Sequence, residues 1–204
     1  SIGNNADRPS GTMVMPGKYT ASLHARVNGA AMQVAGPVNF ELVDVTNGSL
    51  DGASRANAYA FQRDLEAARA KNAAANTTIA DLMDKAKLYR LAMDRSNDTA
   101  ALEGQYEALR QELYAIDEML NGERSRAGKG SRPASVGSRL NFANGASSGT
   151  YGPTQQARDQ YGYALEALNG ATARLATLTG STVPSFEMAL DNAGAPWVRG
   201  SDIK

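Results

Sequence analysis

The pattern that most constrains the fold of this chain is a heptad repeat that runs from Phe61 to Met93. Its members follow one another at alternating steps of four and three residues: Phe61, Leu65, Ala68, Asn72, Ala75, Ile79, Leu82, Ala86, Tyr89 and Met93. This spacing places them on one face of an α-helix and is typical of helices that pack side by side. Because no Gly or Pro occurs between Ser54 and Ser96, the sequence predicts one helix of about 40 residues, roughly 60 Å long.

A second run with the same spacing predicts a helix that packs against the first. Residues 96–98 supply capping side chains for its start, and Gly122 supplies its end. Its apolar seam consists of Leu102, Tyr106, Leu109, Leu113, Ile116 and Leu120. Because a short connection favours antiparallel neighbours, we expect these two segments to form a long antiparallel helical hairpin.

Two further helices are expected toward the C-terminus. Pro153 and Thr154 can open the first of them, and Gly180 is predicted to end it. Its expected inner stripe is Tyr161, Leu165, Leu168, Thr172 and Leu175. A short last helix behind Pro184 would bury Val183, Phe186 and Leu190, and the only tryptophan, Trp197, is expected to dock on the bundle. The predicted fold class is therefore mainly α, with a three- to four-helix bundle.

The stretch between these helical regions has a different composition. Residues 123–152 are rich in Gly, Ser and Arg and are interpreted as a linker, in which Val136, Leu140 and Phe142 offer the only basis for a short helix. The basic residues of this region are Arg124, Arg126, Lys129, Arg132 and Arg139. Because no aromatic residues for base stacking are interleaved with them, we interpret them as solubilising.

The first 50 residues follow the period of a β-strand. Tyr19, Ala21, Leu23, Ala25 and Val27 alternate with polar residues, and Val38, Phe40 and Leu42 alternate again further along. Between them Asn28-Gly29 favours a tight two-residue turn. A hairpin is marginal alone, so this one must pack on the helices or complete a larger sheet. Residues 1–50 are therefore assigned to a β-hairpin region and residues 51–204 to the helical bundle.

Charge and composition narrow the classes of function. Lys and Arg together count 21, as do Asp and Glu, so no net field attracts nucleic acid or an anionic membrane. Cysteine is absent, which excludes disulfides and thiolate chemistry. No apolar stretch approaches the roughly 20 residues that a transmembrane helix needs. We therefore expect neither nucleic acid nor a membrane span.

No set of catalytic, cofactor-binding or metal-binding residues is recognised, and the chain is predicted not to be an enzyme. The only histidine, His24, falls by strand parity on the polar face of the hairpin, away from partners for a metal or a catalytic triad. Asp81 with Asp84, and Asp117 with Glu118, come closest to paired carboxylates. Because they sit off the apolar seams, we interpret them as solvated helix residues.

Two polar residues lie on the predicted seams. Asn72 and Thr172 could fix the register of the helices or the choice of partner, as buried polar residues do in coiled coils. A local hydrogen bond, or a place at the edge of the seam, would explain them equally well. Neither residue is treated as a site.

The order of several short runs resembles a known family. These runs are residues 15–23, 36–42, 60–63, 120–122, 138–140, 153–159 and 193–197. Together they resemble the C-terminal region of bacterial exported proteins with sialidase-type (BNR) or sortilin-like propeller repeats, many of which are labelled glycosyl hydrolases. The resemblance implies that the hairpin is the end of an Ig-like domain, that propellers lie upstream, and that the protein is periplasmic or secreted. No catalytic residue of a hydrolase maps onto this chain.

Two functions follow as expectations. The first is a non-catalytic structural or protein-interaction module, whose partner is an upstream propeller domain, another protein or a second copy of the chain. The alternative is an accessory carbohydrate-binding module of a parent glycosyl hydrolase, which would use exposed aromatics such as Tyr151, Tyr163 or Trp197.

Overall fold

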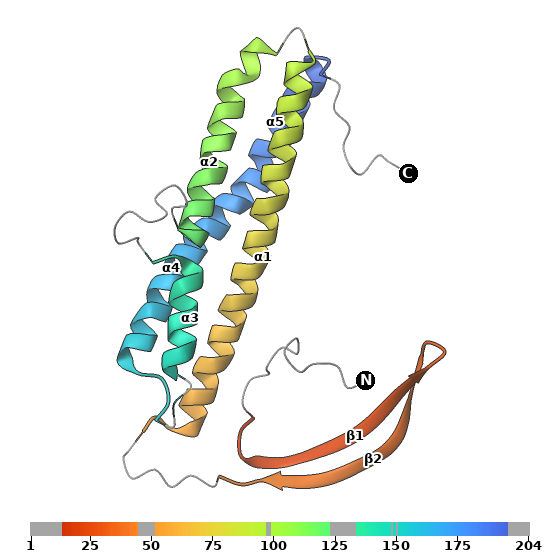
Figure 1. Cartoon of the computed structure of the whole chain (residues 1–204), viewed down its shortest axis with the longest axis vertical. Coiled ribbons are helices and arrows are strands. Elements are labelled where there is room, and N and C mark those ends of the chain that lie inside the picture. The colour runs from red at the N-terminus through yellow and green to blue at the C-terminus, as the bar shows by residue number, and fades with distance from the viewer. Residues whose placement is uncertain are drawn as a thin grey trace, which may run out of the picture.

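The computed structural model describes residues 14–44, 52–96, 99–122, 134–147, 149 and 151–195. Its elements in chain order are β1 (Gly17–Val27), β2 (Ala30–Leu42), α1 (Arg55–Asp94), η2 (Ala100–Leu102), α2 (Glu103–Asn121), α3 (Val136–Ser147), α4 (Gln155–Thr177), η3 (Leu178–Thr182) and α5 (Val183–Asn192). The fold is mainly α with a small β-hairpin before it, as predicted (Figure 1).

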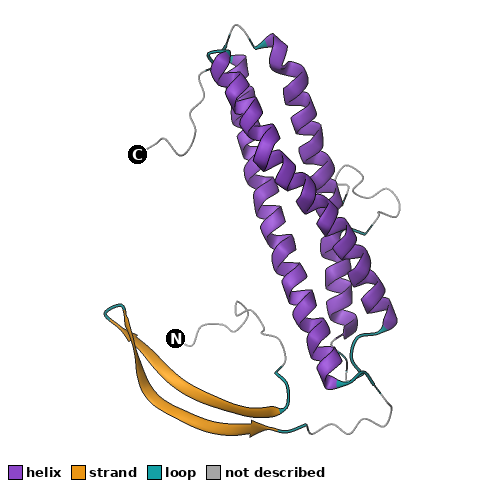
Figure 2. Ribbon diagram, turned by 180° about the vertical axis from the view of Figure 1, so that it is seen from behind, coloured by secondary structure: helices purple, strands orange, loops and turns teal. Residues whose placement is uncertain are grey.

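The helices form three long rods side by side (Figures 1 and 2). Helix α1, of 40 residues, runs the length of the bundle as the first rod. Helix α2 returns antiparallel to it, and α3 continues in the same direction toward the other end, so that these two shorter helices make the second rod. Helix α4, the turn η3 and α5 form the third rod. The predicted antiparallel helical hairpin is thus confirmed within a bundle.

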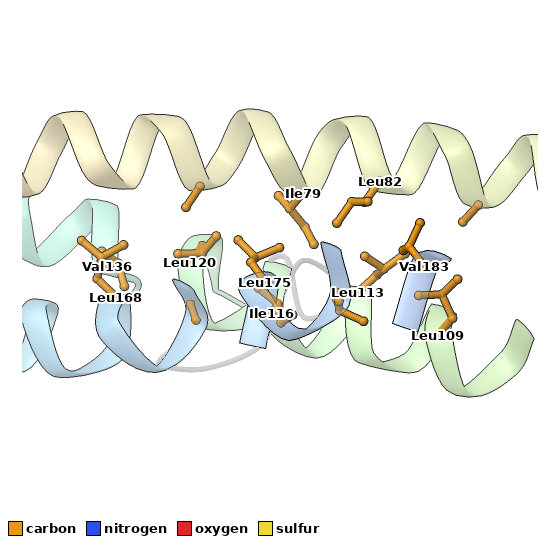
Figure 3. Packing of buried hydrophobic residues seen from close by; sticks show 14 of the residues in the cluster. Ile79, Leu82, Leu109, Leu113, Ile116, Leu120, Val136, Leu168, Leu175 and Val183 are labelled. Atoms are coloured by element: carbon orange, nitrogen blue, oxygen red, sulfur yellow. The ribbon is translucent and has the colours of Figure 1, made fainter. Parts of the chain in front are cut away.

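Both predicted heptad seams form the core. Every apolar member of the two seams is buried, from Phe61 to Met93 on α1 and from Leu102 to Leu120 on the returning segment. Figure 3 shows Ile79 and Leu82 of α1 on the side of that helix that faces the other labelled core residues. Burial of these side chains is the main favourable contribution to the bundle, at roughly 1.5–3 kcal/mol for each large apolar group.

The helix ends show why the rods begin and stop where they do. The Ser54 hydroxyl caps α1 by accepting a hydrogen bond from the Asn57 amide at 3.2 Å. At the other end, the buried Thr99 hydroxyl donates to the Met93 carbonyl at 3.0 Å. Gly122 ends α2 with φ at 79°, a conformation that glycine adopts without strain. Of the expected capping residues 96–98, only Ser96 lies within the described part of the chain.

The third rod differs from the prediction at its middle. Gly180 does not end a helix, because α4 continues through the π turn Leu178–Thr182 directly into α5. Pro184 lacks an amide hydrogen, and its ring would clash with the carbonyl four residues earlier in a regular α-helix. A wider turn is one way for a helix to accommodate such a break. The predicted burial of Val183, Phe186 and Leu190 is confirmed.

The inner face of α4 is also shifted from the expected stripe. Leu168 and Leu175 are buried as predicted, whereas Tyr161, Leu165 and Thr172 are only half-buried. The remaining buried positions of α4 are alanines: Ala157, Ala164 and Ala171. The distance between packed helices depends on the side chains at the contact, so small residues allow α4 to lie close to its neighbours. The prediction favoured larger side chains, and it therefore rotated the buried face of α4 toward Tyr161, Leu165 and Thr172.

Part of the expected linker is helical. Residues 136–147 form α3, which buries Val136, Leu140, Ala143 and Ser147 against the bundle. Their spacing of four, three and four residues is that of the other seams, but the Gly and Ser residues between them obscured it. Phe142, which the sequence placed in the same short helix, is 44% exposed. The possible short helix at Val136 and Leu140 is therefore found as α3, and the interpretation as a linker was wrong for residues 136–147.

Two glycines of α4 give a matched test of helix propensity. A Cβ added at Gly162 would meet nothing within 4 Å, so Gly162→Ala is expected to raise the free energy of unfolding by about 0.5–1 kcal/mol. At Gly170 a Cβ would lie 3.3 Å from Cε of Met119, so Gly170→Ala should give a smaller gain or a loss. Urea denaturation followed by circular dichroism measures both. Equal gains for the two variants would contradict the packing described at Gly170.

Candidate interaction surface

The β-hairpin forms around the turn that the sequence predicts. Asn28 and Gly29 have φ values of 51° and 85°, the positive values that a two-residue hairpin turn of this kind requires. Val27 pairs with Ala30 next to the turn, and Gly17 pairs with Leu42 at the open end. Strand β2 therefore starts directly after the turn and is longer than the stretch of alternating residues that indicated it.

The two strands bring their apolar side chains to one face. Residues that lie directly opposite each other in an antiparallel pair share a face, and Tyr19 pairs with Phe40 while Ala21 pairs with Val38. The rings of Tyr19 and Phe40 stack with their centroids 5.9 Å apart. Further pairs on this face join Leu23 to Ala35 and Ala25 to Met32.

The other face of the hairpin is polar. Lys18 pairs with Glu41, and Thr20 pairs with Asn39, to whose side-chain oxygen the Thr20 hydroxyl donates at 2.8 Å. His24 pairs with Gln33 on this face, where strand parity placed it. The hairpin is thus amphipathic along its length.

The apolar face is uncovered in the part of the chain that the structure describes. Leu23 and Val38 are each 62% exposed, and Phe40 is 46% exposed. The sheet contains β1 and β2 alone among the described residues, and Figures 1 and 2 show it extending away from the bundle. Of the two arrangements expected for the hairpin, packing on the helices is not seen among the described residues, and completion of a larger sheet stays a prediction. An exposed apolar patch of this kind usually marks an interaction site.

Two local features set the shape and attachment of the hairpin. The pairing shifts register between Ala21 and Leu23 and again at His24. At this irregularity Gly36 has φ at 87°, and a Cβ there would lie 2.6 Å from the Ala21 carbonyl oxygen, so only glycine fits. Such irregularities bend a strand and increase its twist. Beyond β2, Asp44 accepts two hydrogen bonds from Arg55, the first residue of α1, at 2.7 and 2.8 Å.

The four carboxylates considered in the sequence as possible catalytic pairs differ in exposure and in hydrogen bonding. Asp84 forms an exposed ion pair with Lys87 at 2.6 Å, and Asp81 is exposed. Asp117 is buried and accepts a hydrogen bond from Asn121 at 2.7 Å, so the expectation that it is a solvated residue was wrong. Its neighbour Glu118 is exposed. The sequence pattern missed this burial because Asp117 follows the seam residue Ile116 and lies at the edge of the helix interface.

The two polar seam residues differ from each other. The Thr172 hydroxyl donates to the Leu168 carbonyl at 2.9 Å within its own helix. A local hydrogen bond was one of the explanations considered for this residue from the sequence. Asn72 is different, because its side-chain oxygen is buried and has no hydrogen-bond partner among the described residues. The nearby Asn76 amide donates to the Asn72 backbone carbonyl and accepts, through its oxygen, a hydrogen bond from Asn121 of α2. A polar layer thus joins α1 to the end of α2.

Two of the three candidate sugar-stacking aromatics lie within the described residues. Tyr151 and Tyr163 are both exposed, but Arg139 lies over the Tyr163 ring with its guanidinium carbon 5.3 Å from the ring centroid. Arg139 also donates to Gln160 at 2.6 Å, so this member of the basic cluster is held against the bundle. Trp197 and the other four members of the cluster lie outside the described residues.

Among the described residues, no three His, Asp or Glu side chains are grouped so that they could hold a metal ion. Within the same residues, no helix combines the length and apolar character that crossing a membrane requires. Comparison of the chain with protein-family models, with curated proteins and with solved structures finds no match.

Proposed function

We propose that this chain is a non-catalytic structural or protein-interaction module, in which the bundle is a stiff support and the hairpin docks on another β-sheet. The observation that carries the proposal is the uncovered apolar face of the hairpin, which includes Leu23, Val38 and Phe40. Burying each of these side chains would contribute roughly 1.5–3 kcal/mol to an association.

The form of the hairpin favours a sheet as its partner. Its strands of 11 and 13 residues are long compared with the usual five or six, and a two-stranded sheet of this kind is marginal by itself. Sheets with one apolar and one polar face commonly pack face to face at a separation of about 10 Å. We therefore assign the hairpin to the end of an Ig-like sandwich whose other strands come from an upstream part of a larger exported propeller-repeat protein, in line with the resemblance in the sequence.

The non-catalytic part of the proposal is supported by the surroundings of the carboxylates. Asp84 and Asp117 are engaged with Lys87 and Asn121 within their own helices. One carboxylate of each candidate pair, Asp81 with Asp84 and Asp117 with Glu118, is thus engaged with a neighbour on its own helix. We place any glycan chemistry of the parent protein in its propellers.

The test compares two lysine substitutions on the same strand. Val38→Lys puts a charge on the apolar face, and Asn39→Lys puts the same charge on the polar face. Both are made in this chain and in a longer chain extended upstream along its reading frame. Amides of β1 and β2 should exchange with solvent at least tenfold more slowly in the longer chain than in this chain. A tenfold change corresponds to about 1.4 kcal/mol. Val38→Lys should remove this protection, whereas Asn39→Lys should keep it.

Four other outcomes would count against this proposal. Equal exchange in both chains, or a reading frame without an upstream β-domain, would show that the partner does not come from the same polypeptide. Concentration-dependent dimers that Val38→Lys abolishes would instead identify a second copy as the partner. Saturable binding to a glycan array that is lost on Trp197→Ala or Tyr163→Ala would favour the accessory carbohydrate-binding module.

A further inference from the structure

A cavity that is open to solvent on one side lies between α2 and the π turn of the third rod. Its volume is about 420 Å³, and Ala108, Leu109, Leu178 and Phe186 supply apolar lining. Ligand sites for small molecules usually measure about 300–1,000 Å³ and are lined mainly by apolar residues with a few polar groups. The size and lining of this cavity therefore match a small organic molecule.

The local structure explains why the space is present and why it is well formed. The π turn inserts extra backbone into the third rod, and π turns are frequent at functional sites. Opposite it, the exposed Ala108 lines the open side of the cavity with only a methyl group. The Phe186 ring is held by two tyrosines, with centroids 5.4 Å from that of Tyr89 and 6.3 Å from that of Tyr106. One wall of the cavity is thus fixed by aromatic packing.

The charges at the cavity are already matched to each other. Glu112 and Arg174 form a two-pronged pair, with both nitrogen–oxygen distances at 2.6 Å. The third Arg174 nitrogen lies 3.2 Å from the Met119 sulfur. The hydrogen bonds from Arg174 lower the pKa of the Glu112 carboxyl below its ordinary value of 4.5, against the opposing effect of burial. Because each of these two side chains already has its partner, the pair offers no unpaired charge to a charged ligand.

Uncharged hydrogen-bonding groups complete the lining. Gln105, Thr177, Thr182 and Ser185 border the cavity. The Thr177 hydroxyl donates to the Ala173 carbonyl of its own helix at 3.3 Å, which leaves its lone pairs able to accept. These groups can donate to or accept from a hydroxyl or carbonyl oxygen on a bound molecule.

From these observations we propose that the cavity binds a small, uncharged and largely apolar molecule that carries one hydroxyl or carbonyl group. The apolar part would lie against Leu109, Leu178 and Phe186, and the oxygen would lie at the rim near Ser185. This site is separate from the hairpin, so it stands or falls independently of the proposed docking function.

The test uses 1-naphthol as the probe and the intact chain with labelled leucine methyl groups. Addition of 1-naphthol should shift the methyl signals of Leu109 and Leu178 and leave those of Leu140, in α3, unchanged. Ala108→Leu places a larger side chain in the cavity and should weaken binding about tenfold or more, whereas Ala101→Leu should not, because Ala101 is equally exposed but does not line the cavity. Naphthalene-1-carboxylate, of similar shape but charged, should bind at least tenfold more weakly than 1-naphthol.

The proposal is overturned if millimolar 1-naphthol leaves the Leu109 and Leu178 signals unchanged, or if Ala108→Leu binds the probe as well as the original chain does. Tighter binding of the carboxylate would overturn the assignment of an uncharged ligand, because it would mean that Arg174 is available to an anion. Shifts confined to Leu23 on the hairpin would show that the probe binds the apolar sheet face instead.

Discussion

Replacing Leu113 by alanine is expected to lower the free energy of unfolding by about 3 kcal/mol. Leu113 is buried in the seam of α2, and Figure 3 shows it among the packed side chains between the rods. Removing its branched end would take away apolar burial and leave a cavity that the long, rigid helices cannot close fully. Leucine-to-alanine changes at such positions cost roughly 2–5 kcal/mol. Urea denaturation followed by circular dichroism at 222 nm gives the value.

The matched control for this substitution is Leu91→Ala on α1. Leu91 is 51% exposed, so the same change removes little burial and should cost less than about 1 kcal/mol. Both variants keep a good helix former at a helical position, so helix propensity contributes little to the difference. Similar losses for Leu113→Ala and Leu91→Ala would contradict the placement of the core between α1 and α2.

Replacing Tyr89 by phenylalanine is expected to lower the free energy of unfolding by about 2 kcal/mol. The Tyr89 hydroxyl donates a hydrogen bond to Glu187 of α5, and both side chains are buried. Lys85 of α1 also reaches this carboxylate, at 3.4 Å. Phenylalanine keeps the ring but removes one donor from a buried acceptor, which typically costs about 1–3 kcal/mol.

The control for this change is Tyr114→Phe, which removes an exposed hydroxyl from α2 and should change stability by less than about 0.5 kcal/mol. Thermal unfolding of the two variants beside the original chain makes the comparison. If Tyr89→Phe were as stable as Tyr114→Phe, the contact between α1 and α5 through Glu187 would not contribute to holding the third rod in place.

The parts of the fold that could be predicted are those where one local signal dominates. Steps of four and three residues from Phe61 to Met93 admit only one helical face, and every apolar residue on that face is buried. Asn28-Gly29 similarly determines the hairpin turn, because few other pairs accept positive φ at both positions. In both cases the information lies within a short stretch of sequence.

The parts that failed depend on contacts between distant segments. Gly180 and Pro184 look like helix punctuation, yet the rod continues because Leu178 on one side and Phe186 on the other are both buried in the same core. The inner face of α4 is chosen by close packing that favours Ala164 over Leu165, which the size of a side chain alone does not reveal. Tertiary packing overrides local propensity at these positions.

The candidate sites divide in the same way. The amphipathic hairpin was visible in the sequence, including the polar placement of His24, but its lack of cover was not. The cavity beside α2 could not be foreseen at all, since it arises where the small side chain of Ala108 meets a π turn some 70 residues later in the chain. A void has no sequence pattern of its own.

Because the second rod is divided into α2 and α3, the bundle can assemble from two pairs of helices that are neighbours in sequence. Helix α2 follows α1 closely in the chain, and α3 likewise precedes α4 by a short connection. The two helices of each pair are close in sequence, so bringing them together costs little loop-closure entropy. Proteins dominated by such local contacts are fast folders, so we expect two helical pairs to form early and to join along α1 in the final step.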